Sequence, residues 1–283
     1  MVMEDDSVGP TSGRATGPGG VARAFALLRL VGDGHPRGLR LSEIADRAGL
    51  PRPTVHRTLR ALAAEHAVAF DPRGKRYTLG LGLLVLGARA GGAHGLRDLA
   101  SAPLLRLTAS LGETLFLLVR NGYDAVCIDR SAGPLPVRSF TGDIGGRVPL
   151  GIGQAATAIL AFLPAAEQDE VIRYNLPRVS EFGGPDEASL RAELAQVRRD
   201  GYCGGASGLI PGMAGVGAPI RDHEGRAVAA ISVGTTVDRL TPERRGVIAE
   251  MLMREAAAIG ARLDPFDPTL RRAGAAMEGG GRR

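Results

Sequence analysis

The most constraining feature of the sequence is a pair of short helical segments separated by a glycine-containing turn. The residues from Leu41 to Ala48 have helical apolar spacing, with Ser42 as the expected N-cap, and Gly49 ends the segment. A second helix is predicted from Arg52 to Glu65, with its apolar residues on one face and basic and polar residues on the other. This arrangement predicts a helix-turn-helix over about residues 41–64.

The segments on either side complete a winged domain. A first helix is expected from Val21 to Val31. After the helix pair, Val68 to Phe70 and Arg76 to Leu79 read as two strands around a polar turn, which adds a wing. The small apolar stretch from Leu81 to Ala90 suits a linker helix that packs against a partner subunit.

The charge of the chain is concentrated in this region. Residues 21–80 contain 11 Lys and Arg against 5 Asp and Glu, a net of +6, whereas residues 81–267 contain 19 against 21, a net of −2. A local basic excess on a helix-turn-helix favours binding to DNA, because each cation can replace a counterion of a phosphate. A winged helix that serves only protein interaction would explain the fold but not this charge.

Side chains near the start of the second helix would read base edges in the major groove, and the wing tip would contact the backbone or minor groove. Arginine suits guanine, and Thr54 suits a phosphate. The candidate DNA-binding residues are Ser42, Arg52, Pro53, Thr54, His56, Arg57, Arg60, Arg73, Lys75 and Arg76.

The rest of the chain predicts a larger domain of mixed α+β class, with an antiparallel sheet and helices grouped around it. Thr241 and Pro242 are typical of the start of a last helix, which is expected to reach Leu263. The expected strands are Thr114 to Val119, Ala125 to Asp129, Val137 to Phe140, Val216 to Ile220 and Ala227 to Val233, and the other expected helices are Leu96 to Leu111, Gln154 to Leu163 and one from Glu187 to Gly201.

These patterns divide the chain into five parts. We expect a flexible leader over 1–19, the winged helix-turn-helix domain over 20–80, a linker helix over 81–94, the larger α+β domain over 95–267, and a flexible tail over 268–283. Glycine and proline interrupt the two uncharged runs, Val148 to Ala166 and Cys203 to Ile220, so we expect no membrane span. The acidic start of the chain is unlike a secretory signal, and we expect a cytoplasmic location.

The sequence resembles the IclR family of bacterial transcriptional regulators over residues 20 to 267. The resemblance rests on LSEIADRAGLPRPTVHRTLRAL and continues through LGETLFLLV, VCIDR, GRVPL, LRAELAQVRRDGY, GAPIRDHEGRAVAAISV and RLTPER. It implies a winged helix-turn-helix followed by a GAF-like effector-binding and oligomerisation domain over 95–267. It also implies a homodimer or dimer of dimers on double-stranded operator DNA, and a small-molecule effector that modulates operator affinity.

The resemblance places the effector pocket on three segments, Gly151 to Ala156, Cys203 to Gly217 and Ile231 to Thr236. The family's acidic run after the GY pair is replaced here by glycine and small residues, and its second serine near the last segment is Gly234. Such changes enlarge a cavity and remove groups that orient a small hydroxy or keto acid, which favours either a bulkier or less polar effector or a pocket that has lost its ligand. The candidate effector-binding residues are Gln154, Ala155, Gly205, Gly215, Ser232, Gly234 and Thr235.

The main alternative is a dinucleotide-binding enzyme. Gly151 to Ala156 form a GxGxxA string after an apolar strand and before a helix. The fingerprint also needs a parallel strand with an acidic end about 20 residues later, but Glu167 to Glu170 begin another polar helix. Neither Cys127 nor Cys203 has a recognisable histidine partner, and His56 has no second ligand at i+3 or i+4. We therefore expect no catalytic residues, cofactor or metal.

Overall fold

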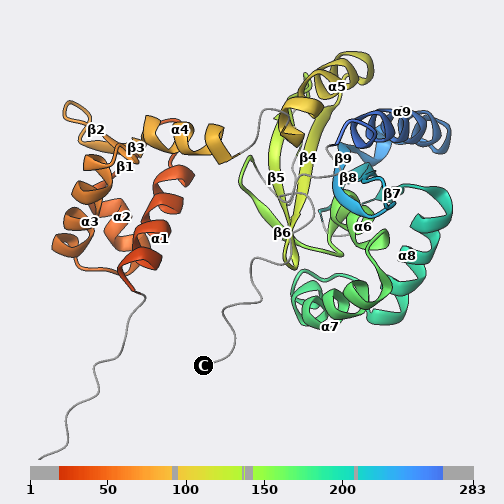
Figure 1. Cartoon of the computed structure of the whole chain (residues 1–283), viewed down its shortest axis with the longest axis horizontal. Coiled ribbons are helices and arrows are strands. Elements are labelled where there is room, and N and C mark those ends of the chain that lie inside the picture. The colour runs from red at the N-terminus through yellow and green to blue at the C-terminus, as the bar shows by residue number, and fades with distance from the viewer. Residues whose placement is uncertain (1–18, 91–94, 136, 138–142, 207–209, 264–283) are drawn as a thin grey trace, which may run out of the picture. The chain divides into compact units, whose positions relative to one another are not determined.

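The structure is a computed structural model that describes residues 19–90, 95–135, 137, 143–206 and 210–263 (Figure 1). The chain separates into two compact units, Met1–Gly92 and Ala93–Arg283. The first contains the expected winged helix-turn-helix, and the second contains the expected sheet and helices.

The first unit is built on a three-helix core. Leu27, Val55 and Leu59 are fully buried in this core, and Tyr77 closes it from the wing. The helices are α1 (Gly20–Asp33), α2 (Leu41–Ala48), α3 (Arg52–Ala64) and α4 (Leu81–Ala90), and the strands are β1 (Leu39–Arg40), β2 (Val68–Asp71) and β3 (Arg76–Leu79).

The turn of the helix-turn-helix forms at Gly49, whose φ of 62° is left-handed and therefore suits glycine. The predicted capping of α2 is wrong, because Ser42 lies inside the helix and Arg40 is the N-cap residue. Glu43 accepts a hydrogen bond of 2.6 Å from the Arg40 N–H, so the helix begins two residues earlier than a Ser42 N-cap would place it.

The wing has three strands in the order β1-β3-β2, all antiparallel. The short strand β1 was not predicted, since two residues carry too little periodicity to be recognised. The predicted turn after β2 is confirmed, and the Asp71 carboxylate accepts hydrogen bonds of 2.9 Å from the N–H groups of Arg73 and Gly74. These bonds hold the wing tip in one conformation.

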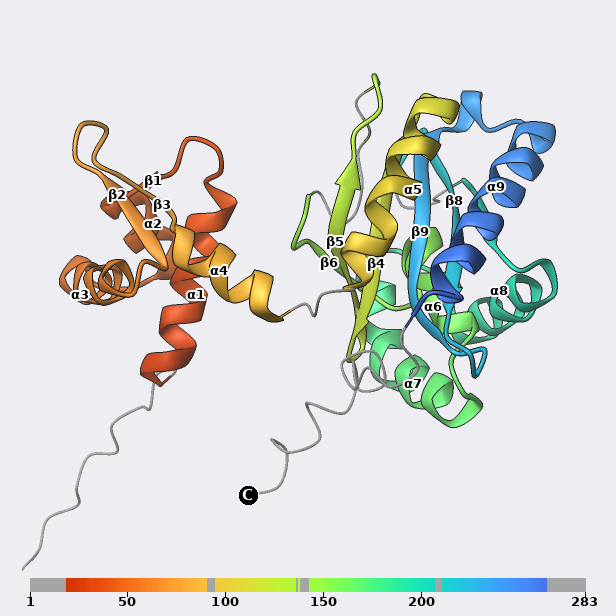
Figure 2. The same ribbon diagram turned by 45° about the horizontal axis from the view of Figure 1, so that its top comes forward.

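The second unit has a six-stranded antiparallel sheet in the order β6-β5-β4-β9-β8-β7. Helices α5 and α9 cover one face, and α6 covers the other with α7 and α8 outside it (Figure 2). The strands are β4 (Thr114–Asn121), β5 (Asp124–Ser131), β6 (Arg147–Pro149), β7 (Cys203–Ala206), β8 (Met213–Arg221) and β9 (Ala227–Thr236). The helices are α5 (Leu96–Leu111), α6 (Gly153–Ala161), α7 (Ala165–Glu181), α8 (Glu187–Asp200) and α9 (Pro242–Gly260).

Most of the predicted elements of this unit are confirmed, and Thr241 caps α9 by accepting from the Arg244 N–H. Among the expected strands there was none at Cys203–Ala206, which is the edge strand β7. Backbone pairing with β8 can hold a strand that has almost no side chains. Residues 138–140 of the strand expected at Val137 to Phe140 lie outside the described residues. Among the helices that the structure describes, none is long and apolar enough to span a membrane.

Candidate DNA-binding surface and effector site

Helix α3 presents a basic outer face because its apolar residues recur every four positions and are buried. Val55 and Leu59 are fully buried against the core of the first unit. Thr54 is half-buried, and its carbonyl accepts from the Thr58 hydroxyl at 3.0 Å. The predicted contact residues of this helix that are exposed are Arg52, Pro53, His56, Arg57 and Arg60.

The start of α3, the start of α2 and the wing tip meet at a basic hollow. This hollow has a volume of about 510 Å³. It is lined by Arg40, Leu41, Ser42, Arg52, Arg73, Gly74 and Lys75. Four predicted residues, two on the helices and two on the wing, therefore line one cavity. Cations with hydroxyl and backbone donors beside them suit a phosphate oxygen.

Arg40 is a cation of this hollow that is not among the predicted DNA-binding residues. Strand β1 pairs Arg40 with Arg76 and leaves the Arg40 side chain exposed at the edge of the cavity. The signal for its position was Glu43, which as the third residue of a helix would place the N-cap at residue 40. The hydrogen bond from the Arg40 N–H is the main cause that keeps the pKa of the Glu43 carboxyl below its ordinary value. The positive charge of the nearby Arg76 acts in the same direction.

Arg76 differs from the other wing cations because it is engaged within the domain. It is half-buried, donates to the Gly38 carbonyl at 2.7 Å, and lies 3.8 Å from the Glu43 carboxylate. Arg73 and Lys75 are exposed at the wing tip. The exposed cations, rather than Arg76, are placed to meet a ligand from solution.

In the second unit, three of the predicted effector residues form a row of glycines across neighbouring strands. Gly205 of β7 pairs with Gly215 of β8, and Gly215 pairs with Gly234 of β9. Directly paired residues point to the same face of a sheet, and here that is the face covered by α6. The row is therefore a strip of this face without side chains.

Side chains from other elements fill the space above the row. A Cβ atom on Gly215 would lie 3.0 Å from the Gln154 Oε1 atom, and one on Gly234 would lie 2.8 Å from a methyl of Val137. The Gln154 Nε2 atom donates to the Gly205 carbonyl at 3.2 Å. Ala155 is buried in the core beside this contact. The structure thus brings Gln154, Ala155 and the three glycines together, as the resemblance implied.

Ser232 and Thr235 lie on opposite faces of β9. Ser232 pairs with Gly217 and with Phe116, on the face of the glycine row. Thr235 is buried on the other face, where its hydroxyl donates to the Glu113 carboxylate at 2.9 Å. Thr235 is therefore not brought to the glycine row, because successive residues of a strand alternate between faces.

A buried carboxylate joins four segments on that second face. The Glu113 side chain is 1% exposed, and its Oε1 atom lies 2.9 Å from Arg239 and 2.9 Å from Arg244. Arg244 also donates to the carbonyls of Arg239 and Leu111. No sequence pattern indicated this cluster, because Glu113 lies more than 120 positions from Thr235 and Arg239.

A pocket of about 250 Å³ lies on the outer side of Gln154. It is lined by Gly151, Gly153, Gln154, Thr157, Gly183, Gly184, Pro185, Glu193, Cys203 and Ala206. Burial, together with the neighbouring Glu193 carboxylate, raises the pKa of the Cys203 thiol well above its ordinary value. Burial also raises the pKa of Cys127 to about 11. Both thiols are therefore protonated at neutral pH and are poor nucleophiles.

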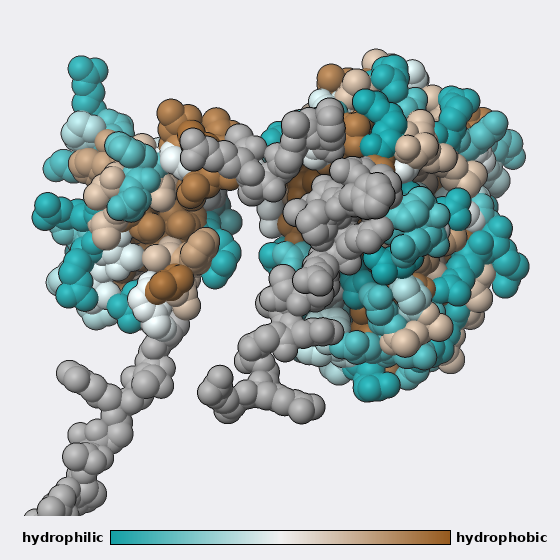
Figure 3. Space-filling view, in the orientation of Figure 1, coloured by the Kyte–Doolittle hydropathy of each residue, from teal (hydrophilic) through white to brown (hydrophobic). Residues whose placement is uncertain are grey.

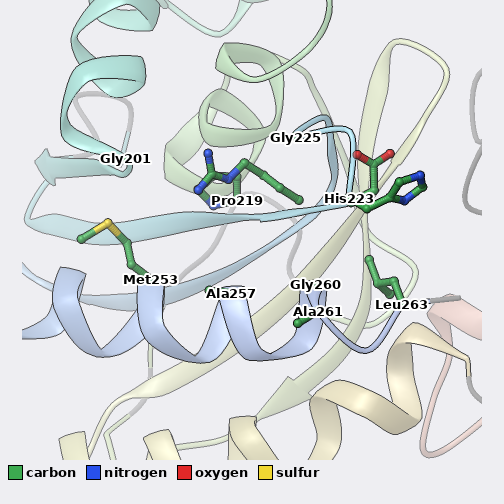
Figure 4. Close-up of a pocket in the computed structure, with 11 residues that line it drawn as sticks. Gly201, Pro219, His223, Gly225, Met253, Ala257, Gly260, Ala261 and Leu263 are labelled. Carbon is green, nitrogen blue, oxygen red and sulfur yellow. The ribbon is translucent and has the colours of Figure 1, made fainter. Parts of the chain in front are cut away.

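A larger hollow of about 590 Å³ lies between β8 and the end of α9 (Figure 4). Met253, Ala257 and Leu263 supply apolar lining, His223 stands at one end of the hollow, and Asp222 is among the polar residues that line it. None of the residues that the resemblance places in the effector pocket is among the described residues that line this hollow.

The geometry does not form a dinucleotide-binding unit around Gly151 to Ala156. Helix α6 is followed by α7 rather than by a strand, and every pair in the sheet of this unit is antiparallel. The fingerprint depends on a parallel strand-helix-strand unit, so the glycines here serve a different fold. Within the described part of the chain, no cluster of three or more His, Cys, Asp or Glu residues could hold a metal ion.

Two family models match the chain. The model described as IclR helix-turn-helix domain matches residues 20–72, and the model described as Bacterial transcriptional regulator IclR C-terminal matches residues 89–261. The chain is 30% identical to the HTH-type transcriptional regulator KipR of Bacillus subtilis over 244 residues, which are 86% of this chain and 96% of KipR. It is 32% identical to the glycerol operon regulatory protein of Streptomyces griseus over 221 residues, 78% of this chain and 86% of that protein.

Solved structures agree with these matches. The IclR protein of Thermotoga maritima superposes with a TM-score of 0.70 at 26% identity, covering 86% of this chain and 98% of that one. An IclR regulator from Alicyclobacillus acidocaldarius gives 0.73 at 27% identity, with 87% and 99% covered. An IclR homologue from Microbacterium hydrocarbonoxydans, solved with 4-hydroxybenzoate, has the same fold, with a TM-score of 0.72, 24% identity, and 86% and 98% covered.

Proposed function

The chain belongs to the IclR family of bacterial transcriptional regulators, and from that premise we propose that its first unit binds a double-stranded operator while a small molecule in its second unit modulates the affinity. The observation that carries the DNA-binding assignment is the basic hollow, where α2, α3 and the wing supply Arg40, Arg52, Arg73 and Lys75.

The exposed residues of α3 and the hollow divide the work of binding. We assign base reading to the outer face of the helix, chiefly to Arg57 and His56, which are exposed one turn after the N-terminus. We assign phosphate contacts to the hollow, since its cations converge on one volume rather than along a base edge. Arg76 is assigned the structural role of holding β3 to the Gly38 carbonyl.

We infer a homodimer from the apolar surface of the first unit. Brown apolar atoms gather over α4 in Figure 3. The large apolar residues exposed on α1 and α4 are Val21, Phe25, Leu81, Leu84, Val85 and Leu86, and Leu81 is 70% exposed. Four of these residues lie on the single short helix α4, and a monomer rarely leaves such a cluster in water, so a second copy of the chain is the favoured cover. A second copy would also supply the second reading helix for a palindromic operator.

The effector assignment rests on the family and on the glycine row. One protein of this fold was crystallised with 4-hydroxybenzoate. In this chain the face under α6 has lost side chains at Gly205, Gly215 and Gly234, and Ser232 is the hydroxyl on the neighbouring position. An effector acts only through its different affinities for the DNA-competent and DNA-incompetent arrangements.

The experiment is a titration of the purified chain on its own upstream intergenic DNA and on random duplex, at about 50 and about 200 mM salt. The proposal expects a specific complex that is tighter than the random one at both salts, with a steep loss of affinity at the higher salt. Absence of any DNA binding would return the winged domain to a protein-interaction role. Chain mass in the same samples, measured by light scattering, tests the dimer.

A further inference from the structure

We propose that the Gln154 side chain occupies the effector site of this protein, and that the effector is a molecule with an amide-like hydrogen-bond donor that replaces this side chain on the Gly205 carbonyl. The inference rests on the proposed effector function of the second unit, and it names the chemistry of the ligand and the residue that selects it.

The backbone positions Gln154 tightly. At Gly217 a Cβ atom would lie 2.7 Å from the carbonyl carbon and oxygen of Gln154, so the first turn of α6 lies directly on β8. From that fixed start the side chain reaches over Gly215 and ends at the Gly205 carbonyl of β7, 3.2 Å from its Nε2 atom. The amide thus bridges α6 and the edge strand across a position where the sheet has no side chain of its own.

This side chain also lies between a pocket and the glycine row. On its outer side lies the pocket of about 250 Å³, and on its inner side lies the glycine row. Without the amide, a ligand in this pocket could reach the backbone of Gly215, because the Gln154 Oε1 atom lies 3.0 Å from the Cβ position of that glycine. In the structure the protein's own side chain fills this position, so a ligand must compete with it.

The groups around the Gln154 amide favour a ligand that donates a hydrogen bond over a ligand that carries a negative charge. When Gln154 is displaced, the Gly205 carbonyl loses this hydrogen bond, which a ligand that donates can replace and a ligand without a donor cannot. Among the described residues that line the outer pocket, the one with a charge is Glu193, whose carboxylate lies 3.6 Å from the Cys203 sulfur. A carboxylate ligand would meet both a carbonyl and a like charge, whereas an N–H group would meet an acceptor.

Acetamide is the probe, because Gln154→Ala removes from the side chain the atoms that acetamide supplies. The measurement is the thermal unfolding midpoint of the full chain with about 100 mM acetamide or acetate. We expect acetamide to raise the midpoint of the variant by about 3 °C and to leave the wild type unchanged, since the wild-type site is already filled. Acetate should have no effect on either.

The matched control is Gln168→Ala. Gln168 is also half-buried and its amide also donates to a backbone carbonyl, that of Leu160 at 2.9 Å, but it lies away from the glycine row. Its variant should not respond to acetamide. If Gln154→Ala does not fold, soluble yield with acetamide or acetate in the refolding buffer replaces the midpoint, and acetamide alone should restore it.

Three outcomes would overturn the inference: no response of Gln154→Ala to acetamide, an equal response to acetate, or an equal response of Gln168→Ala. Since this measurement contains no DNA, it fails independently of the regulator assignment. If the chain binds its operator but acetamide has no effect, the regulator assignment stands and the ligand site is refuted. If acetamide has the expected effect but the operator is not bound, the ligand site stands and the regulator assignment is refuted.

Discussion

The two candidate sites of this protein are built in opposite ways. In the first unit, exposed arginines and a lysine project from a winged core into a basic hollow, so the site consists of side chains that are present. In the second unit, the floor of the site is a row of three glycines, so its shape is set by backbone that carries no side chains. A site of the first kind tolerates changes to its scaffold better than one of the second, whose shape depends on how closely the backbones pack.

The largest expected effect breaks the second unit while leaving the first intact. Glu113→Ala removes the buried carboxylate that holds Thr235, Arg239 and Arg244, and loss of a buried pair in this way costs about 3 kcal/mol. Calorimetry of the full chain should show the transition of the second unit at lower temperature and that of the first unchanged.

The control for that variant is Glu255→Ala. Glu255 also faces an arginine at 2.9 Å, but Arg106 is 61% exposed, so this loss should stay below about 1 kcal/mol. Equal losses for the two variants would mean that the Glu113 cluster does not hold β9 and α9 together.

A second variant tests whether the glycine at position 217 of β8 allows α6 to pack closely on the sheet. Gly217→Ala would place a methyl 2.7 Å from the Gln154 backbone, and such overpacking costs about 1–3 kcal/mol. Gly246→Ala on α9 is the matched control, since no atom lies within 4 Å of its Cβ position and alanine favours a helix by about 0.5–1 kcal/mol. The unfolding midpoints of the second unit should move in opposite directions, and a neutral Gly217→Ala would refute close packing at β8.

The sequence predicted the two sites unequally for the same physical reason. Arg52, Arg57 and Lys75 lie near one another along the chain, and local helical and turn patterns were sufficient to place them. The glycine row draws on three strands, and only the family resemblance brought Gly205, Gly215 and Gly234 together. Thr235 was assigned to the same site although its face depends on strand register, and Glu113 was missed because its partners are distant in sequence.

Within the first unit, base reading and phosphate binding can be separated. Arg57→Ala should cost about 1–3 kcal/mol on the operator and relax base preference there, because it removes a side chain on the exposed face of α3. Lys75→Ala should weaken operator and random DNA about equally and reduce the salt slope by about 1. Titrations of both variants on both duplexes measure this, and equal losses of Arg57→Ala on the two would contradict its assignment to bases.

The smallest expected effect concerns the acid stability of the first unit. The bond from the Arg40 N–H, aided by the charge of Arg76, lowers the pKa of Glu43 in the folded state. A carboxyl with a lowered pKa stabilises the fold above its ordinary unfolded value, and this contribution is lost as the pH falls through the folded pKa. Glu43→Gln should therefore destabilise the first unit at neutral pH, and its difference in stability from the wild type should shrink below about pH 4.5.

Because Glu43 helps to start α2 beside the basic hollow, the same variant should also loosen Arg40 and weaken random DNA binding slightly. Glu65→Gln, outside the hollow, should change neither the stability nor the DNA binding. A difference that grows on acidification would show that the capping bond does not stabilise this helix.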